Sequence, residues 1–201
     1  MNDRSRRVRL SALASLAALL VLGGCATQLK PPISGYACCN LPTSSDIVYA
    51  SNVLGGPIVP AGEAIRIETS KRDAYFWGYA GGSYVGFTDD VNPGSTNKVT
   101  ARAWINRIVV AEDPARRLAT WPADVQNAIR SGKVFAGMTR EQVLVSLGYP
   151  SPADVPDVTV PTWRYWTSRD DEPLALRFAA DGRLEAVDGP TSAKRMVEYL
   201  R

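Results

Sequence analysis

The pattern of apolar and polar residues between positions 46 and 113 predicts β structure. Residues 64–69 read Ala-Ile-Arg-Ile-Glu-Thr, an alternation that predicts a strand with one buried face. Residues 74–79 and 83–87 are rich in aromatic and β-branched side chains and flank an Ala-Gly-Gly sequence typical of a hairpin turn. Residues 104–110 predict a last strand. Short strands joined by glycine-rich turns indicate a small all-β domain, either a barrel or a sandwich.

After position 114 the apolar residues follow the period of a helix. Residues 122–130 predict a short helix with one apolar stripe and a proline in its first turn. Residues 139–147 predict a second helix whose two ends are both specified. Thr139 is the N-cap, and Gln142, three residues later, completes a capping box. Gly148 supplies the left-handed position that ends the helix.

Three further strands and a last helix follow these two helices. The strands are predicted at 162–166, 174–178 and 183–187, and the last helix at 192–200. We therefore expect an α+β fold class: two helices packed on a three-stranded antiparallel meander, preceded by the small all-β domain. The expected organisation is a signal peptide at 1–24, a flexible linker at 25–45, a β-rich domain at 46–113, an α+β domain at 114–190 and a C-terminal helix at 191–201.

The first 25 residues have the organisation of a secretory signal. Residues 1–9 are cationic, and residues 10–22 form an apolar run shorter than the roughly 20 residues that span a bilayer. The sequence Leu-Gly-Gly-Cys, ending at Cys25, resembles the lipobox of bacterial lipoproteins. The resemblance implies cleavage before Cys25 and fatty acids on that residue, which anchor the chain to a membrane. Ala26, by resemblance to the enterobacterial sorting rule, implies the outer membrane and a chain that faces the periplasm. The alternative is an ordinary secretory signal in which Cys25 is incidental.

The predicted linker, residues 25–45, is rich in Pro, Ser, Thr and Gly and contains two adjacent cysteines. A disulfide between neighbours is hard to reach across one peptide bond. A bond from Cys38 or Cys39 to another chain, and two reduced thiols, are both compatible with the periplasm.

Composition excludes several kinds of chemistry. The chain has no histidine, so a histidine-based triad, a histidine-ligated metal site and a haem on histidine are excluded. The net charge of +3 belongs to the first 24 residues, because the rest of the chain is neutral overall, and it does not indicate nucleic-acid binding. Carboxylate pairs at 89–90 and 170–172 lie in turn-like sequences. We therefore expect no catalytic residue, no cofactor and no metal, and the chain is predicted not to be an enzyme.

The C-terminal half carries a family resemblance. It rests on Ile129, Gly132, Val134, Gly137, Met138, Thr139, Gln142, Val143, Leu147, Gly148 and Pro150, followed by Trp163, Tyr165, Leu176, Phe178, Gly182, Arg183 and Leu184. This pattern resembles the BamE (SmpA/OmlA) family of outer-membrane lipoproteins. The resemblance implies an ααβββ fold, a protein partner such as the β-barrel assembly machinery, and no enzymatic activity. Residues 60–63 and 109–110 resemble bacterial SH3-like modules, which implies peptidoglycan as an alternative partner of the β-rich domain.

Aromatic residues near position 165 are the candidate partner-binding site. Trp163, Tyr165 and Trp166 lie within four residues, with Arg164 beside them and Arg177 on the next strand. Aromatic rings together with arginine are typical of protein interfaces. The alternative is that Trp163 and Tyr165 belong to the core while Trp166 covers a helix edge. The sequence thus predicts a protein-binding outer-membrane lipoprotein in outer-membrane protein assembly or envelope integrity, with peptidoglycan binding as the alternative.

Overall fold

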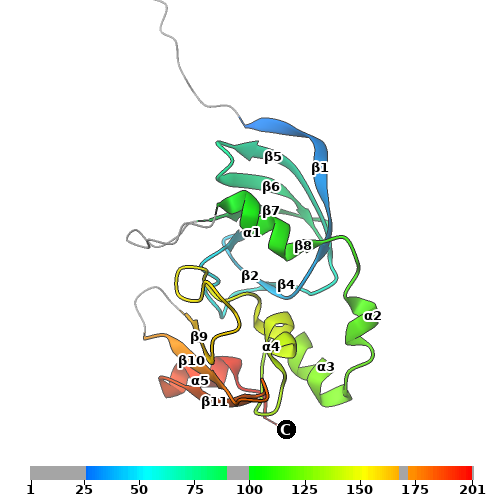
Figure 1. The fold of residues 1–201 in the computed structure, drawn as a ribbon. Helices are drawn as coiled ribbons and strands as arrows, with labels where there is room; N and C mark the ends of the chain where they lie inside the picture. The colour runs from blue at the N-terminus through cyan, green and yellow to red at the C-terminus, as the bar shows by residue number, and fades with distance from the viewer. Residues whose placement is uncertain (1–25, 90–99, 168–171, 201) are drawn as a thin grey trace, which may run out of the picture.

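The computed structural model describes residues 26–89, 100–167 and 172–200, which form two packed units (Figure 1). The first, here called the β unit, is an eight-stranded sheet in the order β4-β2-β3-β7-β6-β5-β1-β8 that curls around helix α1. Pairing is antiparallel except between β3 and β7. Its elements are β1 (Thr27–Ala37), β2 (Leu41–Ser44), β3 (Ile47–Tyr49), β4 (Ile58–Val59), β5 (Ala64–Lys71), β6 (Tyr75–Ala80), β7 (Ser83–Thr88), α1 (Ala101–Ile108) and β8 (Val109–Val110).

The alternating segments form the strands expected of them. Ile65 and Ile67 of β5 face the inside of the curl, as do Phe76 of β6 and Phe87 of β7, and all four are buried in one core. The hairpin turn between β6 and β7 falls at Gly81 and Gly82. The predicted strands at 64–69, 74–79 and 83–87 are therefore confirmed. In β5 and β6 period-two alternation places one face of the strand in the core, whereas residues 85–88 of β7 are all buried.

Helix α1 replaces the strand predicted at 104–110, and that prediction is wrong. The segment contains β-branched residues, but its buried side chains recur at intervals of three and four, which is the helical period: Ala101, Trp104, Ile105 and Ile108. Thr100 begins the helix as its N-cap, and its hydroxyl accepts a hydrogen bond from the backbone nitrogen of Ala103 at 3.2 Å. Only residues 109 and 110 are extended.

The linker predicted at 25–45 is likewise corrected, because this segment forms β1 and β2. Thr27 already pairs with Ser70 of β5. Two prolines, Pro31 and Pro32, lie where the register of β1 against β5 shifts, between Gln28 and Ile33. Proline has no backbone N–H to donate, so it is tolerated at such an irregularity. A proline-rich composition therefore did not prevent strand formation here.

The second unit, here called the C-terminal unit, is a three-stranded antiparallel sheet in the order β11-β10-β9 with four short helices. The helix at residues 140–147 begins at a capping box: Thr139 Oγ1 accepts from Gln142 N at 3.3 Å, and Gln142 Oε1 accepts from Thr139 N at 2.9 Å. The elements are α2 (Ala115–Leu118), α3 (Ala123–Arg130), α4 (Arg140–Leu147), β9 (Thr162–Tyr165), β10 (Leu174–Phe178), β11 (Leu184–Asp188) and α5 (Thr191–Val197).

The predicted α+β fold class is wrong for this chain. The described residues are mostly β, with a curled eight-stranded sheet, a three-stranded sheet and only 22% of residues in five short helices. Two segments account for the error: residues 25–45 were expected to be outside the fold, and residues 114–190 were expected to fold separately. Both expectations ignored contacts between residues far apart in sequence. The predicted C-terminal helix at 191–201 also ends earlier, at Val197.

Buried Asn40 joins the two units. Its side-chain nitrogen donates to the carbonyl oxygens of Ile129 at 2.7 Å and Ser146 at 2.9 Å, which end α3 and α4. Its side-chain oxygen accepts from the backbone nitrogen of Ala61 at 3.0 Å. Its own backbone nitrogen donates to the carbonyl oxygen of Val145. A single residue of the β unit therefore bonds to carbonyl groups at the ends of two helices. The carbonyl oxygen of Ile129 also accepts from the backbone nitrogen of Gly132 at 2.9 Å, so Asn40 gives it a second donor.

Asn52 also connects the two units through side-chain hydrogen bonds to backbone carbonyl groups. Its side-chain nitrogen donates to the carbonyl oxygens of Leu147 at 2.9 Å and Tyr149 at 2.6 Å. Close by, Leu54 donates its backbone N–H to the carbonyl oxygen of Trp166 at 2.7 Å. These bonds fix β9 and the end of α4 against the β unit. The two units therefore form one body held by hydrogen bonds that need specific partners.

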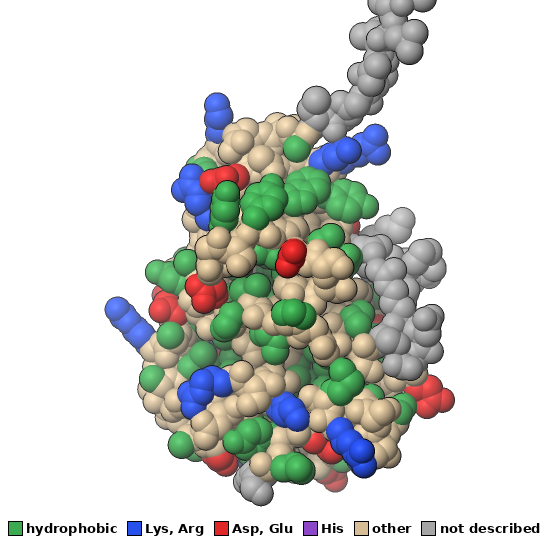
Figure 2. Space-filling view, turned by 180° about the vertical axis from the view of Figure 1, so that it is seen from behind, with side chains coloured by type: hydrophobic (Ala, Val, Ile, Leu, Met, Phe, Trp, Pro, Cys, Tyr) green, Lys and Arg blue, Asp and Glu red, His purple; other side chains and the backbone are tan. Residues whose placement is uncertain are grey.

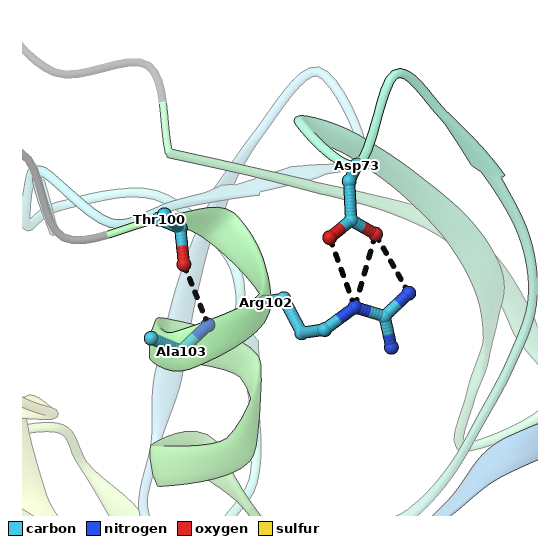
Figure 3. A network of polar contacts seen from close by, with 4 residues as sticks. All are labelled: Asp73, Thr100, Arg102 and Ala103. Carbon is cyan, nitrogen blue, oxygen red and sulfur yellow. Dashed lines mark hydrogen bonds and ion pairs between the residues drawn. The ribbon is translucent and has the colours of Figure 1, made fainter.

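An ion pair ties α1 to the turn between β5 and β6 (Figure 3). Arg102 Nε lies 3.0 Å from each carboxylate oxygen of Asp73, and Arg102 Nη2 lies 2.6 Å from Asp73 Oδ1. The guanidinium also lies over the ring of Phe76, 5.2 Å from its centroid. The hydrogen bonds from Arg102 lower the pKa of Asp73 below its ordinary value.

We expect Asp73→Asn to destabilise the protein by less than about 1 kcal/mol at pH 7, because the pair is largely exposed. The pKa of Asp73 is lowered in the folded state, so its contribution is present at neutral pH and is lost as the pH falls through the folded-state value. Urea unfolding of both proteins at pH 7 and pH 3 measures this. The stability difference should shrink at pH 3, and a difference independent of pH would contradict the assignment.

Candidate binding surfaces

The structure does not gather the predicted partner-binding residues on one surface. Trp163 and Tyr165 alternate inward along β9 and are 0% and 1% exposed, whereas Arg164 between them faces solvent. The Tyr165 hydroxyl donates to the carbonyl oxygen of Gly148 at 2.8 Å, and burial raises its pKa well above the ordinary value. These two rings are core residues, so they cannot serve as a binding surface in this fold.

The other residues of that set are dispersed. Trp166 is half-buried, and its ring nitrogen donates to Asp154 at 2.8 Å. Arg177 is exposed on the outer face of β10, where it donates to Asp188 at 2.6 Å and forms an ion pair with Glu185. The outer face of the three-stranded sheet is therefore charged and internally paired. It has the character of a solvated surface.

Several sequence features lie outside the described residues. Cys25 and the expected signal peptide are among them, as are Asp90, Asp170 and Asp171 of the carboxylate pairs. Cys38 and Cys39, in contrast, lie between β1 and β2 and are joined to each other by a disulfide. Neither of the two states considered from the sequence, a bond to another chain or free thiols, is present in this structure.

A groove of about 430 Å³ runs along β11, which is an edge strand of the three-stranded sheet. Its opposite wall is formed by residues 134–136 and by the chain that follows α5. Hydrogen bonds from Val134 N to the oxygen of Val197 at 2.7 Å, and from Tyr199 N to the oxygen of Val134 at 2.8 Å, hold this wall in place. At one end the backbone of Leu184 pairs with the turn before α4. Beyond Leu184, within the described chain, β11 has a neighbouring strand on one side only.

The lining of this groove combines apolar rings with charged side chains. The rings of Phe135 and Tyr199 lie 6.2 Å apart, and Leu200 beside them is 90% exposed. The charged lining residues of the groove are Glu185, Asp188, Lys194 and Glu198. An edge strand offers unpaired backbone N–H and C=O groups, so an extended segment of another protein can add to it as a further strand. This β11 groove is the candidate protein-binding site.

A second surface lies on the outer side of the β unit. Tyr75, Trp77 and Tyr79 alternate outward along β6, and Tyr84 of β7 lies directly opposite Tyr79. The rings of Tyr75 and Trp77 are stacked with centroids 6.1 Å apart, and those of Tyr79 and Tyr84 meet edge to face at 5.4 Å. We call these four residues the tyrosine–tryptophan face. Figure 2 shows hydrophobic side chains in a row on this side of the β unit, with lysine, arginine and acidic side chains around it.

The tyrosine–tryptophan face was missed in the sequence although a signal for it was present. The segment Tyr-Phe-Trp-Gly-Tyr at 75–79 alternates, but with aromatic residues on both faces. Since only one face of a curled sheet can face the core, the larger residues at odd positions had to be exposed once Phe76 and Gly78 faced inward. The exposed fractions of Tyr75, Tyr79 and Tyr84 are 49%, 43% and 56%.

The described residues offer neither a metal-binding cluster nor a membrane-spanning helix. They contain no group of three or more Cys, Asp or Glu side chains placed to hold a metal ion. None of their helices has both the length and the apolar character needed to cross a bilayer. Comparisons with family models, curated proteins and solved structures identified no match.

Proposed function

We propose that this protein is a non-enzymatic outer-membrane lipoprotein that binds a protein partner in the periplasm, in outer-membrane protein assembly or envelope integrity. The β11 groove carries this proposal, because it combines an unpaired strand edge with exposed apolar side chains. The lipobox-like sequence before Cys25 supports the anchor and the location. The absence of histidine and of any nucleophile motif supports a role in binding.

The groove favours an extended partner segment with alternating side chains. A strand added beside β11 gains backbone hydrogen bonds along residues 185–188, and every second side chain faces the apolar wall formed by Phe135 and Tyr199. Exposed Leu200 adds apolar area to the same groove. The charges of Glu185 and Lys194 at the rim limit association with unrelated strands. A component of the β-barrel assembly machinery is the partner that the sequence resemblance implies.

Site-specific photocrosslinking in a bacterium with an outer membrane tests the partner-binding role. We predict that a photoreactive residue at Leu200 or Glu185, which both line the groove, yields an adduct with one envelope protein. The matched control is exposed Ala119 at the end of α2, outside the groove. Groove positions should give at least about tenfold more adduct, the ratio that about 1.4 kcal/mol of preferential binding produces. Equal adducts at groove and control positions would reject the groove.

Mass spectrometry of the mature N-terminus tests the anchor separately. The expected result is a chain that begins at Cys25 and carries fatty acids, and Cys25→Ser should abolish both the modification and recovery with membranes. An unmodified Cys25 thiol would reject the lipoprotein assignment. A partner unrelated to outer-membrane protein assembly would retain the binding role and reject the implied machinery.

A further inference from the structure

We propose that the tyrosine–tryptophan face lies against the phospholipid headgroups of the membrane that holds Cys25. The inference rests on the proposed function, because it takes Cys25 as the lipid-bearing residue. It adds a membrane-contacting surface to the β unit, which the sequence had placed at the end of a linker. In this arrangement the β unit is held on the membrane and the C-terminal unit carries the β11 groove.

The length of chain between anchor and fold is the first argument. Only Ala26 separates Cys25 from Thr27, the first residue of β1. Two residues of extended chain reach at most about 7 Å. The fold therefore begins at the membrane surface, and the 20-residue spacer expected from the sequence does not exist.

Strand register places the tyrosine–tryptophan face at this same end of the molecule. Thr27 pairs with Ser70 of β5, and Ser70 pairs with Phe76 of β6, between Tyr75 and Trp77. Adjacent strands lie about 4.8 Å apart, so Thr27 is about 10 Å from β6. Adding the two-residue reach places Cys25 within about 20 Å of the Trp77 backbone. Figure 2 shows the row of hydrophobic side chains beneath the start of the described chain.

The residue types of the face match a membrane interface. Tyrosine and tryptophan combine an apolar ring with a polar group, and they are enriched where headgroups meet hydrocarbon. Tyr75, Tyr79 and Tyr84 are each more than two-fifths exposed, although large apolar rings gathered on the surface of a monomer usually mark a contact site. The two ring pairs keep four rings together on one side of the sheet.

Basic side chains around the face provide charge complementarity to phosphate headgroups. Lys30, Lys71 and Arg72 are not engaged in ion pairs within the described chain, and Lys71 pairs directly with Tyr75 across the hairpin. Near Tyr75 and Trp77 the acidic groups are neutralised, since Asp73 binds Arg102 and Glu68 binds Arg66. Asp46 and Glu63 lie beside Tyr84, at the other end of the face. The surroundings of Tyr75 and Trp77, the end of the face next to Thr27, are therefore positive, which favours contact of that end with anionic lipid.

A glycan strand of peptidoglycan is the other ligand that exposed aromatic rings could take. The position of the anchor favours the bilayer, because a face held within about 20 Å of the lipid-bearing residue borders the headgroup region. A glycan-binding face would more readily serve at the opposite end, near the C-terminal unit. Binding of this face to peptidoglycan is the alternative that sedimentation with purified sacculi detects.

Fluorescence quenching of the anchored protein tests the proposal. Acylated protein isolated from envelopes is reconstituted into vesicles of phosphatidylethanolamine and phosphatidylglycerol with brominated acyl chains, which quench tryptophan on contact. We expect a loss of emission that disappears in Trp77→Phe. The matched control Trp121→Phe, in a half-buried residue of the C-terminal unit, should retain the quenching. Tryptophan emission that is unquenched in protein bound to the vesicles would overturn the proposal.

A charge variant and a peptidoglycan-binding assay distinguish the remaining outcomes. Reversing both Lys71 and Arg72 to glutamate should make Trp77 at least about fivefold more accessible to aqueous iodide, whereas Arg116→Glu on α2 should not. Sedimentation with purified sacculi that depends on Trp77 would instead assign the face to peptidoglycan. Protein that fails to float with vesicles would reject the lipid anchor, and this inference with it; floating protein with an unquenched Trp77 would reject the face alone.

Discussion

Asn40→Asp is expected to destabilise the folded protein by about 3–5 kcal/mol at pH 7, the usual cost of a buried charge without a counter-ion. The substitution replaces a donor that serves the carbonyl oxygens of Ile129 and Ser146 with a carboxylate oxygen. Two hydrogen bonds that Asn40 donates become two repulsive oxygen–oxygen contacts in a site that is 3% exposed. Urea unfolding followed by tryptophan emission measures the change in free energy.

The pH dependence of this variant separates electrostatics from lost packing. Burial raises the pKa of a carboxyl group, so the folded-state value of Asp at position 40 lies above its unfolded value. The protonated form can donate one hydrogen bond, and stability is therefore lost as the pH rises through the unfolded-state value near about 3.9 and above. The loss should be smaller at pH 4 than at pH 7. Asn106→Asp, on the exposed side of α1, is the control and should change stability by less than about 0.5 kcal/mol.

Local signals allowed part of the fold to be predicted from sequence. The helix at 139–147 was specified at both ends by Thr139, Gln142 and Gly148, and the capping box is present in α4. Such signals act within four residues and need no knowledge of the rest of the chain. The strands β5, β6 and β7 were also predicted, β5 from its alternation and β6 and β7 from aromatic and β-branched segments on either side of a glycine turn.

Long-range contacts explain what the sequence could not show. The pairing of Thr27 with Ser70 makes a strand of a segment whose composition is typical of a linker. Asn40 donates to carbonyl groups 89 and 106 residues away in the sequence. The residues next to Asn40 therefore give no sign that it connects the two units. Helix α1 is a different case, because the helical spacing of Trp104, Ile105 and Ile108 was present but was outweighed by their β propensity.

The binding surfaces illustrate the same limit. Aromatic residues on alternating positions predict a strand, but alternation alone does not say which face is buried. The sequence left open whether Trp163 and Tyr165 belong to a binding surface or to the core, and they lie in the core. Tyr75, Trp77 and Tyr79 were interpreted only as strand residues and face outward. Which face of a strand is buried depends on the sheet to which the strand belongs and on what packs against that sheet. The β11 groove depends on β11 being an edge strand, which is a property of topology.

Trp163→Ala is expected to destabilise the protein by about 3–5 kcal/mol, the range for removing a large aromatic side chain from a core. Its ring lies 4.4 Å from that of Phe178, centroid to centroid, and under the guanidinium of Arg140 at 5.7 Å. Its ring nitrogen donates to the carbonyl oxygen of Val158 at 3.1 Å. The substitution leaves a cavity and also removes that donor, so the loss of stability includes both packing and hydrogen bonding. Chemical unfolding at pH 7 measures it.

Two neighbouring residues provide matched controls that separate a core role from a binding role. Trp166→Ala should cost less than about 2 kcal/mol, because the ring is half-buried and its one hydrogen bond, to Asp154, is worth about 1 kcal/mol. Arg164→Ala, on the exposed face of β9, should change stability by less than about 0.5 kcal/mol. If Trp163→Ala instead left the unfolding midpoint unchanged and reduced only partner crosslinking, the ring would belong to an interface and its place in the core would be refuted. Equal losses for the two tryptophans would likewise contradict the packing described for β9, since Trp163 is fully buried and Trp166 only half-buried.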